Sequence, residues 1–155
     1  MEENPHFKEL LQCLNEAGVE YLIVGGYAVM KYSEPRFTKD LDIWVGSSPE
    51  NAAKLYRALA KFGAPLENDK ITPETFAQDD VVYQIGVAPV RIDILTHVTG
   101  LRFADAWPHR VKGTIFGVPA HFISLNDLKA NMQAMGRESD LDTLHRLPKD
   151  RGNKS

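Results

Sequence analysis

The sequence contains one cysteine, Cys13, and no apolar run of about 18 residues or more. A single cysteine excludes an internal disulfide framework. Its neighbours Leu10, Leu11 and Leu14 indicate a buried thiol that packs rather than reacts. The polar, acidic start of the chain does not resemble a signal peptide, and nothing resembles a transmembrane helix. The sequence therefore predicts a cytoplasmic protein with no membrane partner.

The chain also lacks an excess of positive charge. Its 18 Lys and Arg residues and 21 Asp and Glu residues give a net charge of −3, and the pI is near 5.9. A domain that binds a long polynucleotide usually has a basic pI, so no global nucleic-acid footprint is present. The five histidines show no metal-binding spacing. Only His97, just after a predicted strand, could reach the edge of a cleft.

Length and composition are typical of a soluble globular protein. The chain has 155 residues, of which 43% are hydrophobic and 25% charged. We expect a single domain over residues 1–147, with a helical ending over 124–147. The polar segment 148–155 is expected to be a flexible tail.

Hydrophobic periodicity and turn residues predict an α+β fold, in which helices flank a mixed sheet and a short helical segment ends the chain. Helices are expected at 6–17, 27–32, 50–62, 125–135 and 140–147, with single turns at 73–77 and 103–107. Strands are expected at 21–24, 41–45, 81–85, 90–95, 114–116 and 118–122.

Three aspartates carry the strongest chemical signal. Asp40 directly precedes the strand predicted at 41–45 and Asp42 lies within it, and residues two apart in a strand face the same side about 6.5 Å from each other. Like charges that close are costly unless a cation lies between them, which favours a divalent metal. Asp93 is a lone carboxylate in an apolar strand and also needs a partner or a metal. Arg91, on the same face as Asp93, offers the simpler alternative of an ion pair.

A glycine pair, Gly25-Gly26, separates the first predicted strand from a helix. Glycine lets a phosphate approach the main chain closely, and the N–H groups and dipole of a helix N-terminus favour an anion. Glycine pairs are common at turns, so this signal is weak by itself. If the strand of Asp93 lies beside that of Asp42, the acids and the glycines would suit a two-metal phosphoryl or nucleotidyl transfer site.

Together these motifs resemble the DNA polymerase β-type nucleotidyltransferase superfamily. The segments Ile23-Val-Gly-Gly-Tyr-Ala-Val29 and Arg36-Phe-Thr-Lys-Asp-Leu-Asp-Ile43 are similar to those of its small bacterial members, the abortive-infection toxin-type and the antibiotic nucleotidyltransferases. The resemblance covers about residues 5–147 and includes Gly136-Arg137 and Asp140-Leu141 in the helical ending. The three-part motif is specific for the superfamily and not for the acceptor.

The resemblance implies a role for each matching residue. Asp40, Asp42 and Asp93 would bind Mg²⁺ or Mn²⁺ and catalyse the reaction, and Asp93 would help to deprotonate the acceptor. The remaining residues would bind the nucleoside triphosphate: Gly25, Gly26 and Tyr27 around its phosphates, Arg36, Thr38 and Lys39 as loop anchors or phosphate contacts, and Arg137 from the far side of the cleft.

The implied activity is a magnesium-dependent transfer of a nucleoside monophosphate to an acceptor hydroxyl, with release of pyrophosphate. The acceptor could be an RNA end such as that of tRNA, a protein or a small molecule, and the enzyme could be the toxin of a toxin–antitoxin pair with a cognate antitoxin. Tyr27 stands where many members have serine, and Met132 where toxin-like members often have lysine. These departures keep an alternative open, a non-catalytic or weakly active nucleotide-binding partner or antitoxin module.

Overall fold

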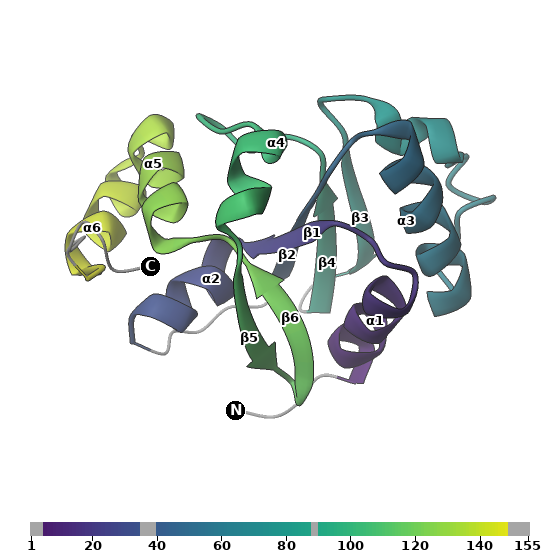
Figure 1. The fold of residues 1–155 in the computed structure, drawn as a ribbon, viewed down its shortest axis with the longest axis horizontal. Coiled ribbons are helices and arrows are strands. Elements are labelled where there is room, and N and C mark those ends of the chain that lie inside the picture. The colour runs from purple at the N-terminus through teal and green to yellow at the C-terminus, as the bar shows by residue number, and fades with distance from the viewer. Residues whose placement is uncertain (1–4, 35–39, 88–89, 149–155) are drawn as a thin grey trace.

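The computed structural model describes residues 5–34, 40–87 and 90–148. Within these residues the chain forms a six-stranded sheet in the order β3-β4-β2-β1-β6-β5. Helices α1 and α3 lie on one side of the sheet, and α2 and α5 lie on the other (Figure 1). The predicted α+β architecture, a mixed sheet flanked by helices, is therefore confirmed.

The sheet combines two hairpins with a central crossover. Its strands are β1 (Tyr21–Val24), β2 (Asp40–Val45), β3 (Val82–Val87), β4 (Val90–Leu95), β5 (Val111–Ile115) and β6 (Val118–Phe122). Strand β1 is antiparallel to β2 and parallel to β6, and β2 is parallel to β4. Strands β2 and β4 are therefore direct neighbours, although a helix and the β3 strand separate them in sequence.

The helices confirm most of the predicted segments. They are α1 (Pro5–Glu16), α2 (Gly25–Tyr32), α3 (Pro49–Phe62), α4 (Phe103–Ala106), α5 (Leu125–Met135) and α6 (Glu138–Arg146), with 3₁₀ turns at Pro73–Ala77 and Trp107–His109. Of the predicted tail, only Pro148 belongs to the described residues. Among the helices that the structure describes, none is both long enough and apolar enough to cross a bilayer.

Several boundaries differ from the sequence prediction, and two of the differences have a clear physical reason. Helix α2 begins at Gly25 itself rather than at Tyr27, because the positive φ of Gly25, +69°, turns the chain from strand into helix without a loop. Strand β5 begins at Val111, before the predicted start at Thr114. Its first residues, including Lys112 and Gly113, have weak strand propensity, and their pairing with β6 outweighs that preference.

Each face of the sheet has its own hydrophobic core. One core joins the face of Leu41, Ile43 and Val45 to helices α1 and α3 and contains the buried Cys13. The other joins the face of Trp44 to α2 and α5. Because side chains alternate along a strand, Asp40 and Asp42 share the face of Trp44.

Asn51 fixes the relative position of β1 and β2. Its Oδ1 accepts a hydrogen bond from the Glu20 N–H at 2.8 Å, and its Nδ2 donates to Gly46 O at 2.8 Å and Glu20 O at 3.0 Å. The side chain is 4% exposed, and its backbone N–H donates to the Ser48 cap of α3. One buried amide therefore holds the start of β1 and the end of β2 together, which stabilises the pairing that positions Asp42.

Candidate active site

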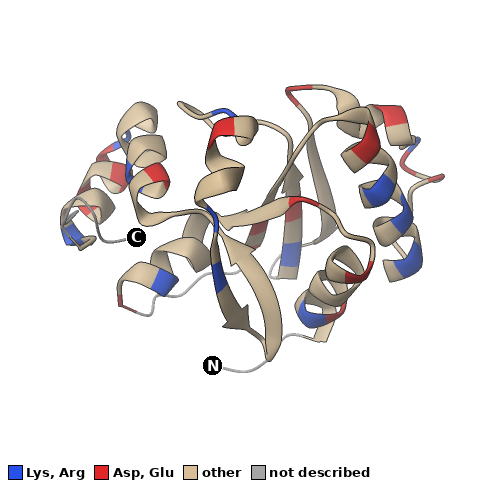
Figure 2. Ribbon diagram, in the orientation of Figure 1, with Lys and Arg blue, Asp and Glu red and all other residues tan. Residues whose placement is uncertain are grey.

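The three predicted aspartates meet on one face of two neighbouring strands. Strands β2 and β4 run parallel with Asp40 opposite Arg91 and Asp42 opposite Asp93. Residues opposite each other on adjacent strands are about 5 Å apart, and residues two apart share a face, so the four side chains form a compact group. Figure 2 shows acidic and basic bands close together on these central strands. The predicted proximity of the three acids is therefore observed.

Arg91 lies at the centre of this group. Its Nε donates to Asp93 Oδ1 at 2.9 Å, and its Nη2 donates to Asp93 Oδ2 at 3.2 Å and to Asp40 Oδ2 at 2.9 Å. The guanidinium thus binds Asp93 in a bidentate manner and bridges it to Asp40. The ion pair that the sequence offered as an alternative to a metal is present.

The cluster carries more negative charge than Arg91 balances. Asp93 is 8% exposed. Burial of Asp42, together with the negative charges of Asp93 and Asp40, raises the pKa of the Asp42 carboxyl from 3.8 to about 7, although Arg91 acts in the opposite direction. A carboxyl whose charge is so disfavoured at neutral pH would be stabilised by an additional cation.

This shift predicts that the chelated, metal-free protein loses stability as pH rises. Between about pH 4 and 7 the folded protein holds a proton on Asp42 that the unfolded chain has released, so unfolding becomes more favourable with rising pH. The shift corresponds to at most about 4 kcal/mol, at 1.36 kcal/mol per unit. Urea unfolding at pH 4.5 and pH 8 measures the loss, and Asp42→Asn should remove most of it. An equal pH dependence in both proteins would contradict the raised pKa.

Gly25 lies directly against the Asp42 carboxylate. A Cβ atom at Gly25 would be 2.2 Å from Asp42 Oδ2, and the φ of +69° also disfavours any side chain there. The preceding residue, Val24, is paired with Asp42 in the sheet and provides no side-chain cap for α2. The start of α2 therefore presents its first-turn N–H groups beside the acid cluster, which is an arrangement suited to an anion.

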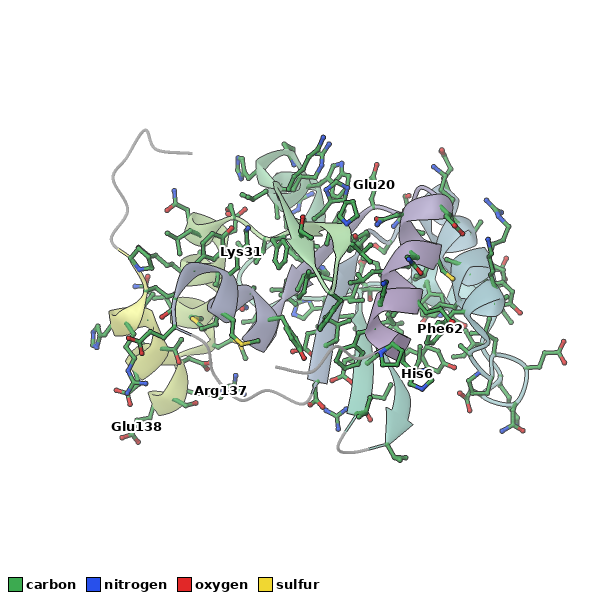
Figure 3. All side chains as sticks on the ribbon, turned by 90° about the horizontal axis from the view of Figure 1, so that it is seen from below. His6, Glu20, Lys31, Phe62, Arg137 and Glu138 are labelled. Carbon is green, nitrogen blue, oxygen red and sulfur yellow. The ribbon has the colours of Figure 1, made fainter. Side chains whose placement is uncertain are left out.

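The other predicted nucleotide-binding residues differ in their surroundings. The Tyr27 ring is 7% exposed and packs edge-on against Phe7 and Phe116, which leaves its backbone amide in the first turn of α2. Arg137 forms a bidentate ion pair with Asp140 at the start of α6, at the end of the molecule marked by Glu138 (Figure 3). The predicted contacts Arg36, Thr38 and Lys39 lie outside the described residues.

Sequence reasoning missed one exposed residue of this region, Gln84. The antiparallel pairing of β3 with β4 places Gln84 opposite Asp93, and therefore on the same face of the sheet. The sequence signal that could have found Gln84 is the hairpin. Once Val87 is paired with Val90, counting back along both strands places Gln84 opposite Asp93. The strand predicted at 81–85 ended too early to show this register.

A separate hollow of about 700 Å³ lies at the opposite ends of β2 and β4. It is lined in part by Trp44, His97, Phe103 and Trp107. His97 follows the C-terminal end of β4, whereas the acid cluster lies toward the start of β2 and the middle of β4. The expectation that His97 reaches the edge of the acidic cleft is therefore wrong, because His97 lies beyond the C-terminal end of β4, away from the acid cluster.

No group of three His, Cys, Asp or Glu residues is arranged to hold a metal ion within residues 5–34, 40–87 and 90–148. The carboxylates of Asp40 and Asp93 instead accept hydrogen bonds from Arg91. Their chemistry nevertheless fits a hard divalent cation, since Mg²⁺ prefers carboxylate oxygens. The excess negative charge shown by the pKa of Asp42 agrees with that preference.

The fold of the chain is similar to that of a solved structure. The chain is similar to the crystal structure of TM1012 from Thermotoga maritima, named as a candidate nucleotidyltransferase, with a TM-score of 0.59, 11% identity and 93% of each chain covered. It is also similar to ANT(2″)-Ia, solved in complex with adenylyl-2″-tobramycin, with a TM-score of 0.48, 14% identity and coverage of 90% of this chain and 92% of that chain. At such identities the likeness to TM1012 shows a shared fold alone. No curated protein matches the sequence.

Residues 4–154 match the model of the family described as "Nucleotidyl transferase of unknown function (DUF2204)". This match spans nearly the whole chain and confirms the nucleotidyltransferase resemblance of its motifs. The protein therefore belongs to this nucleotidyl transferase family.

Proposed function

We propose that the protein transfers a nucleoside monophosphate from a nucleoside triphosphate to an acceptor hydroxyl and releases pyrophosphate, with Mg²⁺ or Mn²⁺ bound by Asp40, Asp42 and Asp93. The observation that carries this proposal is the sheet register, which aligns Val24, Asp42 and Asp93 on three adjacent strands. Asp42 and Asp93 thereby lie next to the start of α2 at Gly25. Carboxylates for a metal and amides for a phosphate thus occur side by side.

Each group has a chemical task in this reaction. When bound, the divalent cations would neutralise charge on the phosphates and lower the pKa of the attacking hydroxyl. The first-turn amides of α2, at Gly25, Gly26 and Tyr27, would donate to phosphate oxygens. Asp93 would accept the proton of the acceptor hydroxyl as that oxygen bonds to the α-phosphorus. The bond from the α-phosphorus to the pyrophosphate oxygen then breaks, so catalysis rests on positioning and charge neutralisation.

The proposed site also includes residues from more distant parts of the chain. Arg36, Thr38 and Lys39 precede Asp40 in sequence and would contact phosphate or anchor their loop. Arg137 would contribute from the helical ending. Its partner Asp140 is 8% exposed, so this contribution would require the Arg137 guanidinium to reach the nucleotide while it remains paired. A nucleoside triphosphate co-substrate agrees with the cytoplasmic location expected from the sequence.

The direct test uses four nucleoside triphosphates, each labelled at the α-phosphate. Transfer of the label is measured to three classes of acceptor, namely tRNA, protein and small molecules that carry hydroxyl groups. We expect one class to gain the mass of a nucleoside monophosphate, with release of pyrophosphate. A chelator should abolish the transfer, and added Mg²⁺ or Mn²⁺ should restore it, because the uncompensated carboxylates cannot position the triphosphate alone.

The outcomes of this assay separate the remaining alternatives. Transfer that persists in the chelator would contradict the metal role of the aspartates. Triphosphate binding without transfer to any acceptor would favour the nucleotide-binding partner or antitoxin module. The labelled acceptor also decides the biological role, since the toxin of a toxin–antitoxin pair has to modify an acceptor that the cell requires.

A further inference from the structure

Arg91 is placed where a cation has the most favourable contacts in the acid cluster. It contacts both oxygens of Asp93 and one oxygen of Asp40, at 2.9 to 3.2 Å. These contacts join two strands, because Asp93 shares β4 with Arg91 whereas Asp40 lies on β2. A bidentate arginine fork matches the planar geometry of a carboxylate better than any other side chain does.

The same contacts occupy carboxylate oxygens that a metal ion would need, and no ready metal site is found among the described residues. Both oxygens of Asp93 already accept hydrogen bonds from the guanidinium, as does Oδ2 of Asp40. A magnesium ion requires oxygen ligands at about 2.0–2.1 Å in nearly octahedral geometry. The positive charge of Arg91 at this position also repels a second cation.

We propose that Arg91 is an internal counter-ion, which neutralises Asp40 and Asp93 in the absence of the divalent cation. Metal binding then requires the guanidinium to release both carboxylates. This inference rests on the proposed function, because it concerns the metal of that same site. Release would take the Arg91 side chain toward solvent, since it is 32% exposed whereas the side chain of Asp93 is 11% exposed. Arg91 is accordingly a positioning residue that sets the cost of loading the metal.

The proposal couples the metal to the nucleotide. A guanidinium that leaves two carboxylates loses charge-assisted hydrogen bonds, and a triphosphate offers it new ones. Metal alone should therefore bind weakly, and metal with triphosphate should bind more tightly, each ligand favouring the other to the same extent. The internal ion pair would in this way keep the acids from holding a metal before the nucleotide arrives.

The test is a Mn²⁺ titration of the full chain at pH 8 without nucleotide, in which electron paramagnetic resonance reports the free ion. We expect Arg91→Met to bind Mn²⁺ about tenfold more tightly than the unmodified protein, because the competing cation has been removed. Arg91→Lys should show a smaller gain, since one ammonium cannot form the bidentate fork. Arg57→Met removes the same charge from the exposed surface of α3 and should leave the affinity unchanged.

A second measurement covers a folding defect in Arg91→Met, whose acids lack a counter-ion. Added Mg²⁺ should raise its melting temperature more than that of the unmodified protein, and Arg91→Lys decides the question if Arg91→Met does not fold. Equal or weaker Mn²⁺ binding by the folded variants would overturn the proposal, even if the unmodified protein still transfers nucleotide. Tighter Mn²⁺ binding by Arg91→Met, in a chain that labels no acceptor, would support the role of Arg91 and contradict the proposed function.

Discussion

A Gly25→Ala variant should lose about 3 kcal/mol of folding stability, or nearly all nucleotide transfer, or both. The methyl group would lie 2.2 Å from Asp42 Oδ2, well inside van der Waals contact. If the backbone yields, overpacking of about 1–3 kcal/mol adds to a cost of about 1 kcal/mol for alanine at positive φ. If the carboxylate of Asp42 rotates away instead, the fold survives and the acid cluster is dispersed.

Gly18→Ala is the matched control for this experiment. Gly18 has a φ of +70°, almost equal to the +69° of Gly25, and no atom lies within 4 Å of the Cβ that would be added. Gly18→Ala therefore has the conformational cost of alanine at positive φ without the steric clash. It should lose about 1 kcal/mol of folding stability and keep full nucleotide transfer. Urea unfolding and the labelled-transfer assay distinguish the two variants. Equal behaviour of both would show that the approach of Gly25 to Asp42 is unimportant.

The positions of the acids could be predicted because they depend on local rules. Alternation along a strand places Asp40 and Asp42 on one face, whatever else the chain does. The cost of a carboxylate in an apolar strand likewise marked Asp93 from sequence alone. The expected strand containing Asp42 agrees with the observed β2 within one residue. Such features require only the chain within a few positions of the residue concerned.

Contacts between distant segments could not be derived in this way. The bridge from Arg91 to Asp40 exists because β2 and β4 are parallel neighbours in a particular register. Several sheet orders satisfy the same hydrophobic pattern, and a shift of one residue would move every side chain to the other face. The packing of Tyr27 against Phe116 is similar, since Phe116 lies in the turn between β5 and β6 with a φ of +53°. Only the assembled fold brings these residues together.

Asp93→Asn should reduce nucleotide transfer by about a thousandfold and leave the protein folded. The amide keeps the shape of the side chain and one acceptor oxygen for Arg91, but it provides no negative charge for a metal and accepts no proton from the acceptor. Loss of one group that stabilises the transition state typically costs about 10²–10³-fold in rate. Asp93 combines two such tasks in the proposed mechanism, which places the expected loss at the upper end of this range.

Two opposing effects keep the folding stability of this variant close to that of the unmodified protein. The negative charge of Asp93 is one cause of the raised pKa of Asp42, so its removal relieves repulsion within the cluster. Against this, the amide NH2 group replaces one of the two oxygens that accept hydrogen bonds from Arg91, which removes a charge-assisted contact. We therefore expect the unfolding free energy of metal-free Asp93→Asn at pH 8 to stay within about 2 kcal/mol of that of the unmodified protein. Asp105→Asn, on the exposed side of α4, controls for the loss of one charge and should leave transfer unchanged. Transfer by Asp93→Asn within tenfold of the unmodified rate would show that the cluster serves the fold alone, because a purely structural carboxylate can be replaced by its amide.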